Sequence, residues 1–170
     1  VVFDLMIHDL DIVQAVVDSE VESIEAVGVP VLTDHVDIAN VRLRFVSGCL
    51  ANLTASRISR DRVRKLRFFQ QDAYIAVDCA EQQTEAWRVD RASRSSPKIN
   101  GGRLDVPIGE PLEYELADFV EAVSSGMAPR VDGLAGRRAL ALAQRVAIEM
   151  QRGMVAFGSG PAGLERRDQA

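Results

Sequence analysis

Residues 39–56 read ANVRLRFVSGCLANLTAS, and this stretch decides the fold. From residue 39 to 45, small and apolar side chains alternate with asparagine and arginine, which is the period of a strand with one buried face. Ser47-Gly48 supplies a hairpin turn, and residues 49–58 alternate in the same way. The stretch therefore predicts an antiparallel hairpin that buries one face.

More strands are predicted on both sides of this hairpin. Turn residues recur about every eight to twelve positions, which favours antiparallel meander connections. The polar residues 90–103 are expected to form an exposed loop, with a short strand at 104–108 after it. The other strands are expected at residues 21–29, closed by Pro30, and at 63–70, 74–79 and 84–89.

Three helices are indicated outside the strand region. Apolar residues recur at helical spacing from about residue 3 to 18. A second helix is expected to start at Pro111 and end at Gly126, and a third to be capped by Asp132 and stopped by Gly153. The predicted fold class is α+β. It has a large, predominantly antiparallel (mixed) open sheet, with one N-terminal and two C-terminal helices packed on one face.

Length and composition are those of a single globular domain. The 170 residues include 47% hydrophobic and 26% charged side chains, a balance that permits an ordinary core. We assign residues 1–157 to one α+β domain and the Gly-rich, then charged residues 158–170 to a flexible tail.

Charge and hydropathy exclude several partners. The net charge of −5 provides no basic excess for phosphate backbones, so nucleic acid is not an expected partner. No apolar run approaches the roughly 20 residues that cross a bilayer, so no membrane association is expected. Cys49 and Cys79 fit buried, reduced thiols, which indicates a cytoplasmic protein.

Asp4 and His8 are the first candidate functional pair. They lie one turn apart on the first helix, where a carboxylate can orient an imidazole and raise its basicity. That arrangement suits a general base. The alternative is a solvated helix face that also carries Asp9 and Asp11. A metal site lacks a third ligand nearby, so no metal is expected.

Residues 158–163 fit the pattern G-x-G-x-x-G. That pattern binds a dinucleotide between a strand and a helix, but here it follows a helix. Only seven residues come after Gly163, too few for a helix and a second strand. The motif is therefore interpreted as part of the tail, and no cofactor-binding residue is assigned in this chain.

The run from Val2 to Val13, VFDLMIHDLDIV, resembles the substrate-domain helix of the Gfo/Idh/MocA oxidoreductases, the glucose–fructose oxidoreductase and inositol dehydrogenase group. Asp4 and His8 match the D-x-x-x-H pair of that family. Glu110-Pro111-Leu112 and the Ala/Leu-rich last helix also look like its C-terminal domain.

The resemblance implies an enzyme that binds NAD or NADP on an N-terminal Rossmann domain and oxidises or reduces a sugar-type or cyclitol carbinol. It makes His8 the base for the hydroxyl proton and Asp4 its partner. The family's E-K-P lysine motif is absent here. The chain is thus interpreted as the substrate-binding and catalytic half, inactive alone, with the nicotinamide bound mainly by the other half.

The segment 55–70 looks similar to members that act on nucleotide sugars such as UDP-N-acetylglucosamine. Arg57 is accordingly a candidate substrate-binding residue, and the alternative is a strand-end charge facing solvent. The expected partners are a small sugar-type substrate and further copies of the chain, joined through the open sheet face. A second hypothesis is a non-catalytic oligomerisation or binding module that uses the same sheet.

Overall fold

The computed structural model describes residues 1–60, 63–91 and 98–158. Its helices and antiparallel strands make an α+β fold with open sheets, which confirms the predicted class. The strands are divided between a three-stranded and a four-stranded sheet. They belong to two compact units, one of Val1–Ile58 with the chain from Arg130 onward, and one of Ser59–Pro129.

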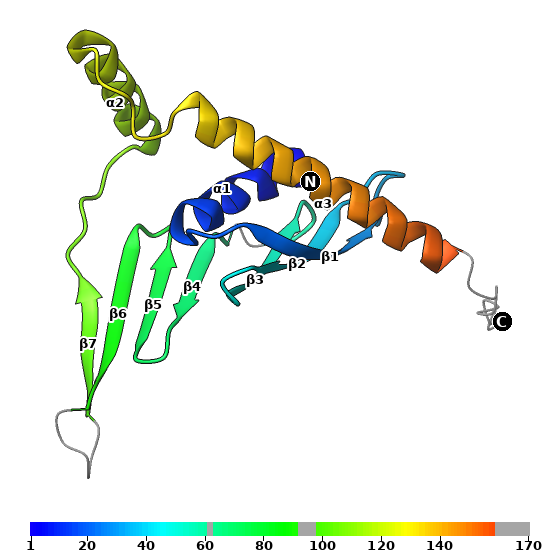
Figure 1. The fold of residues 1–170 in the computed structure, drawn as a ribbon, viewed down its shortest axis with the longest axis horizontal. Helices are drawn as coiled ribbons and strands as arrows, with labels where there is room; N and C mark the ends of the chain where they lie inside the picture. The colour runs from blue at the N-terminus through cyan, green and yellow to red at the C-terminus, as the bar shows by residue number, and fades with distance from the viewer. Residues whose placement is uncertain (61–62, 92–97, 159–170) are drawn as a thin grey trace. The chain divides into compact units, whose positions relative to one another are not determined.

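The first unit is a three-stranded antiparallel sheet with helices on it. The sheet order is β1-β2-β3, so β2 is central. Helix α3 lies along β1 and also contacts α1 (Figure 1). The elements are η1 (Val2–Met6), α1 (Ile7–Val16), β1 (Val21–Val29), β2 (Ile38–Phe45), β3 (Leu50–Ser56) and α3 (Gly133–Gly158).

Strand β2 supplies the middle of the core, as its alternation predicted. Every second residue is buried while the arginines between them are exposed. Met6 and Leu10 from the N-terminal helices, and Val146 from α3, are fully buried against this row. The N-terminal segment η1–α1 and helix α3 therefore cover one face of the sheet, each through its apolar stripe. The buried residues of β2 are Ala39, Val41, Leu43 and Phe45.

The second unit is a four-stranded antiparallel sheet followed by α2. The strands pair in chain order, β4-β5-β6-β7. The side-chain amide of Gln82, in the β5–β6 turn, holds both the N–H and the carbonyl of Gly109 at 2.9 Å. The elements are β4 (Lys65–Phe69), β5 (Ala73–Asp78), β6 (Gln83–Asp90), β7 (Lys98–Leu104) and α2 (Pro111–Ser125).

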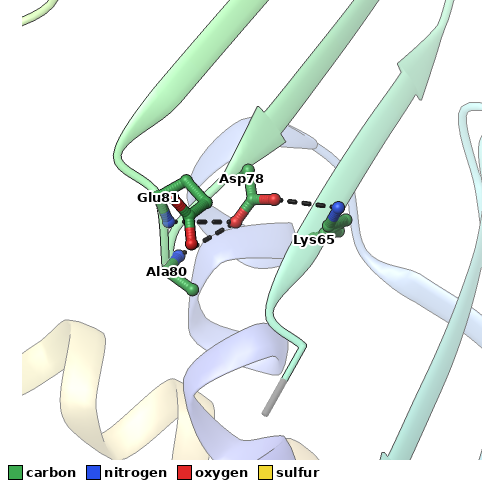
Figure 2. A network of polar contacts seen from close by, with 4 residues as sticks. All are labelled: Lys65, Asp78, Ala80 and Glu81. Atoms are coloured by element: carbon green, nitrogen blue, oxygen red, sulfur yellow. Dashed lines mark hydrogen bonds and ion pairs between the residues drawn. The ribbon is translucent and has the colours of Figure 1, made fainter. Parts of the chain in front are cut away.

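A polar network fixes the turn after β5 (Figure 2). One carboxylate oxygen of Asp78 accepts the backbone N–H groups of Ala80 and Glu81, both at 3.1 Å. Its other oxygen meets the Lys65 ammonium at 2.9 Å from the paired strand. Asp78 thus links the end of β5 to the turn that follows it and to the paired strand β4.

The prediction of a loop at 90–103 is wrong at both ends of that range, because Asp90 ends β6 and residues 98–103 belong to β7. The predicted strand at 104–108 is wrong beyond Leu104, the last residue of β7. Residues 92–97 lie outside the described part. A polar segment that contains a pair such as Gly101-Gly102 favours a loop. Instead, Gly101 lies where the backbone of β6 comes too close for a side chain.

The helix boundaries follow most of their sequence signals. Pro111 is the first residue of α2, and Gly126 ends it with φ of 69°. The Asp132 carboxylate accepts the N–H of Ala135 at 2.8 Å, as an N-cap does. Gly153 is not a stop, because α3 continues to Gly158. The predicted tail lies outside the described residues except for Gly158.

Cys49 is exposed and Cys79 half-buried, so the prediction of buried thiols is wrong. Cys49 lies in the hairpin turn rather than inside a strand.

Among the helices described in residues 1–158, none combines the length and the apolar composition that a membrane span requires.

Candidate functional site

The candidate site begins on an irregular turn at the N-terminal end of the helical segment. Residues 2–6 form a π-helix, in which the N–H of Met6 reaches the carbonyl of Val1 at 3.2 Å. The segment then continues as the α-helix α1. Single π-turns of this kind occur often at functional sites. Val2 and Met6 are buried, and this leaves Asp4 on the exposed side of the same turn.

The structure brings Asp4 and Arg57 together. An Nη atom of Arg57, just after the end of β3, lies 3.7 Å from Oδ2 of Asp4. The Arg57 side chain is 44% exposed and the Asp4 side chain 71% exposed. The ion pair is therefore accessible to solvent and contributes little to stability. Asp4, a candidate from its spacing to His8, and Arg57, a candidate from the resemblance to nucleotide-sugar members, therefore lie together at the surface.

His8 lies one position into α1 and is exposed. Within residues 1–60, 63–91 and 98–158, no hydrogen bond joins its ring to Asp4. Apo enzymes often hold catalytic hydrogen bonds loosely and tighten them around the substrate. The role of the pair stays a prediction. His35, in the loop after β1, is exposed as well.

Sequence reasoning missed Asp37, the residue before β2. Its side chain is buried, with 3% of the residue exposed. One carboxylate oxygen accepts the N–H groups of Val31, Leu32 and Thr33 at 2.9, 2.8 and 3.3 Å. The only signal in the sequence is an acidic residue between a loop and an apolar strand. Short polar side chains at such positions commonly form hydrogen bonds with nearby backbone groups.

The surroundings of Asp37 and Asp78 favour their charged forms. The N–H of Leu32, then that of Val31, lowers the pKa of Asp37, and the Arg57 cation adds to this effect. The hydrogen bond from Lys65, then that from the N–H of Glu81, lowers the pKa of Asp78. Each carboxylate is therefore held ionised by groups that the fold places around it.

These shifts predict an acid-sensitive fold. Because both folded-state pKa values lie below the usual 3.8, the stabilisation is fully present above that pH and is lost as pH falls through the folded values. The free energy of unfolding, measured with urea between pH 6 and 2.5, should decline below about pH 4. Asp37→Asn should flatten the decline, and an unchanged slope in that variant would contradict the assignment.

The candidates for a metal or cofactor site are clusters of His, Cys, Asp or Glu side chains and the G-x-G-x-x-G motif. Within residues 1–60, 63–91 and 98–158, no three His, Cys, Asp or Glu side chains are grouped to hold a metal ion. The G-x-G-x-x-G motif starts at Gly158, the last residue of α3, so it follows a helix rather than preceding one. These residues do not fit a dinucleotide, which needs the opposite order.

Comparison with curated proteins finds a relative in sequence. The chain is 36% identical over 154 residues to UDP-N-acetylglucosamine 3-dehydrogenase of Acidithiobacillus ferrooxidans, which covers 89% of this chain and 49% of the relative. Residues 1–76 match the GFO/IDH/MocA C-terminal domain. The chain thus spans about half the length of the curated relative it matches.

Solved structures show the same architecture. The structure of that dehydrogenase has a TM-score of 0.80 with 33% identity, covering 89% of this chain and 48% of the other. Levoglucosan dehydrogenase, in complex with NADH and L-sorbose, has a TM-score of 0.72 with 14% identity, covering 88% and 47%, and so shows the fold alone. These likenesses define the class, a C-terminal α+β domain of oxidoreductases. The chain belongs to the Gfo/Idh/MocA family and carries its C-terminal domain.

Proposed function

We propose that this chain is the substrate-binding and catalytic half of an NAD(P)-dependent dehydrogenase acting on a sugar, nucleotide-sugar or cyclitol hydroxyl. UDP-N-acetylglucosamine is the first candidate substrate. The observation that carries the proposal is the exposed contact of Asp4 with Arg57, at 3.7 Å, on the helical segment that also presents His8. The 36% identity to a UDP-N-acetylglucosamine 3-dehydrogenase supports the substrate and makes its carbon-3 hydroxyl the first candidate.

His8 is the general base of the proposed reaction. The imidazole of His8 is exposed, and in its neutral form it can take the proton of a carbinol. Asp4, one turn earlier, orients the ring and stabilises the imidazolium that forms. The nicotinamide, when bound by the cofactor domain, supplies the hydride acceptor.

Arg57 is the proposed contact for the substrate. Its guanidinium is a planar fork that fits a diphosphate or sugar oxygens with two parallel hydrogen bonds. At 44% exposure the fork is accessible to a ligand, while Asp4 holds it near the proposed base. Arg57 would then bind the diphosphate of a nucleotide sugar, while the neighbouring His8 and Asp4 would contact its reacting ring.

Catalysis is proposed to require a Rossmann domain joined to this chain. We call the combination of the two domains the two-domain enzyme. The relatives it matches are about twice its length. The chain alone is therefore proposed to have no dehydrogenase activity. Turnover of UDP-N-acetylglucosamine with NAD or NADP by this chain alone would refute that part of the proposal.

A substrate panel tests the proposed function. The two-domain enzyme is assayed for cofactor reduction with UDP-N-acetylglucosamine, N-acetylglucosamine and myo-inositol, with NAD and NADP in parallel. The nucleotide sugar should give the highest kcat/KM, because only it offers a diphosphate to Arg57. A higher kcat/KM for the free sugar or the cyclitol would remove the nucleotide-sugar assignment.

Homo-oligomerisation through the open sheet face is proposed as well. No described residue of β4–β7 is buried, and residues paired across neighbouring strands share a face. Phe68, Ile75 and Ala86 therefore form one row, with Leu66 and Val77 in the next row. Such an apolar face favours a partner. Light scattering of the two-domain enzyme should give a multiple of the monomer mass, and a monomer at micromolar concentration would contradict it.

The same uncovered sheet favours a second candidate function, a non-catalytic oligomerisation or binding module. In that case His8 and Asp4 are solvated surface residues. The two candidates differ in the outcome of the substrate panel, since a binding module reduces no cofactor with any sugar.

A further inference from the structure

Asp37 lies at one end of the three-stranded sheet, where its backbone bonds to residues at the ends of β1 and β3. It directly precedes Ile38, the first residue of the central strand β2. Its N–H donates to the carbonyl of Val29 at 3.0 Å, at the end of β1. Its carbonyl accepts the N–H of Arg57 at 2.9 Å, just beyond the end of β3. The backbone of this one residue thus extends both ladders by one step.

The side chain of Asp37 adds a third connection. Its buried carboxylate gathers the N–H groups of Val31, Leu32 and Thr33, which otherwise lack strand partners at the loop between β1 and β2. A buried carboxylate is tolerated only with such donors, so the loop and the acid stabilise one another. This makes Asp37 a rigid point in an otherwise exposed end of the sheet.

Arg57 is the residue that Asp37 holds and Asp4 contacts. Without the bond to Asp37, its backbone would be the free continuation of an edge strand after Ser56, which pairs with Ile38. Its guanidinium reaches Asp4 at 3.7 Å. A continuous set of contacts therefore runs from the loop through Asp37 and Arg57 to Asp4.

We propose that Asp37 is a positioning residue, which fixes the backbone at Arg57 so that the guanidinium stands beside Asp4 where substrate is read. The inference rests on the proposed function and deepens it, because it names a buried residue on which substrate recognition depends. The backbone carbonyl that accepts from Arg57 remains in Asp37→Ala, so the carboxylate acts indirectly: its bonds to the loop fix residue 37, and residue 37 fixes Arg57. Small displacements of a positioned group lower rates steeply.

A double-mutant cycle in the two-domain enzyme tests the coupling. Asp37→Ala should lower kcat/KM for UDP-N-acetylglucosamine roughly 10-fold, and Arg57→Ala at least as much. In the Arg57→Ala background, Asp37→Ala should lower kcat/KM no further than about 2-fold. Independent, additive losses would overturn the proposal. If Asp37→Ala does not fold, the cycle is made with Asp37→Asn. In the Arg57→Ala background, Asp37→Asn should likewise lower kcat/KM no further than about 2-fold.

Matched variants separate positioning from general destabilisation. Asp37→Asn retains a carbonyl acceptor for the loop and should recover part of the activity lost in Asp37→Ala. Asp78→Ala also removes a carboxylate that accepts two backbone N–H groups, but in the β5–β6 turn. It should lower thermal stability and leave kcat/KM within about 2-fold. A loss of kcat/KM with Asp78→Ala equal to that with Asp37→Ala would count against positioning.

Hydrogen exchange gives a readout that needs no turnover. In the two-domain enzyme, Asp37→Ala should speed exchange roughly 10-fold in peptides that cover residues 31–33 and Arg57, while the buried ladder at Leu43 stays protected. Unchanged protection at Arg57 would overturn the positioning role even if the enzyme oxidises UDP-N-acetylglucosamine. Faster exchange at Arg57 without any sugar oxidation would support the structural coupling and contradict the proposed function alone.

Discussion

His8→Ala should lower kcat of the two-domain enzyme by about 10²–10⁴-fold, the usual contribution of a positioned general base. The physical reason is that no proton acceptor remains at the carbinol when hydride leaves. KM should change far less, because the imidazole contributes little to ground-state binding. Steady-state rates of cofactor reduction with UDP-N-acetylglucosamine measure both constants.

The chain offers a matched control for that variant. His35 is also exposed, lies on the loop after β1, and has its backbone N–H bound to the Thr33 hydroxyl at 3.1 Å. His35→Ala should leave kcat within about 2-fold, since surface substitutions seldom change more. Equal losses in both variants, or an unchanged kcat in His8→Ala, would remove His8 from the mechanism.

Gly101→Ala should destabilise the four-stranded sheet by about 3 kcal/mol or more. Gly101 has φ of 153°, where a side chain is strained. An added Cβ would also overlap the carbonyl oxygen of Ala86 and lie 2.7 Å from Cα of Trp87, on the strand it pairs with. Backbone atoms cannot yield as a flexible side chain can, so β7 must move away from β6. Urea unfolding measures the loss.

Gly102→Ala separates the two causes. Gly102 has nearly the same φ, 155°, but a Cβ there would have no atom within 4 Å. The unfolding free energy lost in Gly102→Ala should therefore come from conformational strain alone, about 1–3 kcal/mol. A Gly102→Ala variant as unstable as Gly101→Ala would show that the close approach of β6 contributes nothing.

Much of this fold follows from local patterns. The strict alternation of residues 39–45 predicts β2 and its buried row, because a one-residue slip would expose that row. Pro111, Gly126 and Asp132 predict helix ends, because their backbone preferences act within a single turn.

Other features depend on what lies across the chain. Gly101 looks like a turn residue until β6 is placed against it. Gly153 could have ended α3, but the helix continues along β1, where a Cβ on this glycine would lie 3.2 Å from the carbonyl oxygen of Ala26. Tertiary contacts of this kind override local propensity.

The candidate site divides in the same way. The spacing of Asp4 and His8 is local and is visible in the sequence. The contact of Asp4 with Arg57 joins residues far apart in the chain, and it depends on how β3 ends beside η1. Asp37 is harder still to predict, because its importance comes from three backbone donors and two strand ends that only the folded chain assembles.

Transfer of deuterium from carbon 3 of UDP-N-acetylglucosamine to the oxidised cofactor tests the central claim most directly. With the two-domain enzyme, mass spectrometry should find the label in the reduced nicotinamide and a 3-keto sugar nucleotide in equal amount. No reduced cofactor from this substrate, or reduced cofactor without the label, would contradict the account.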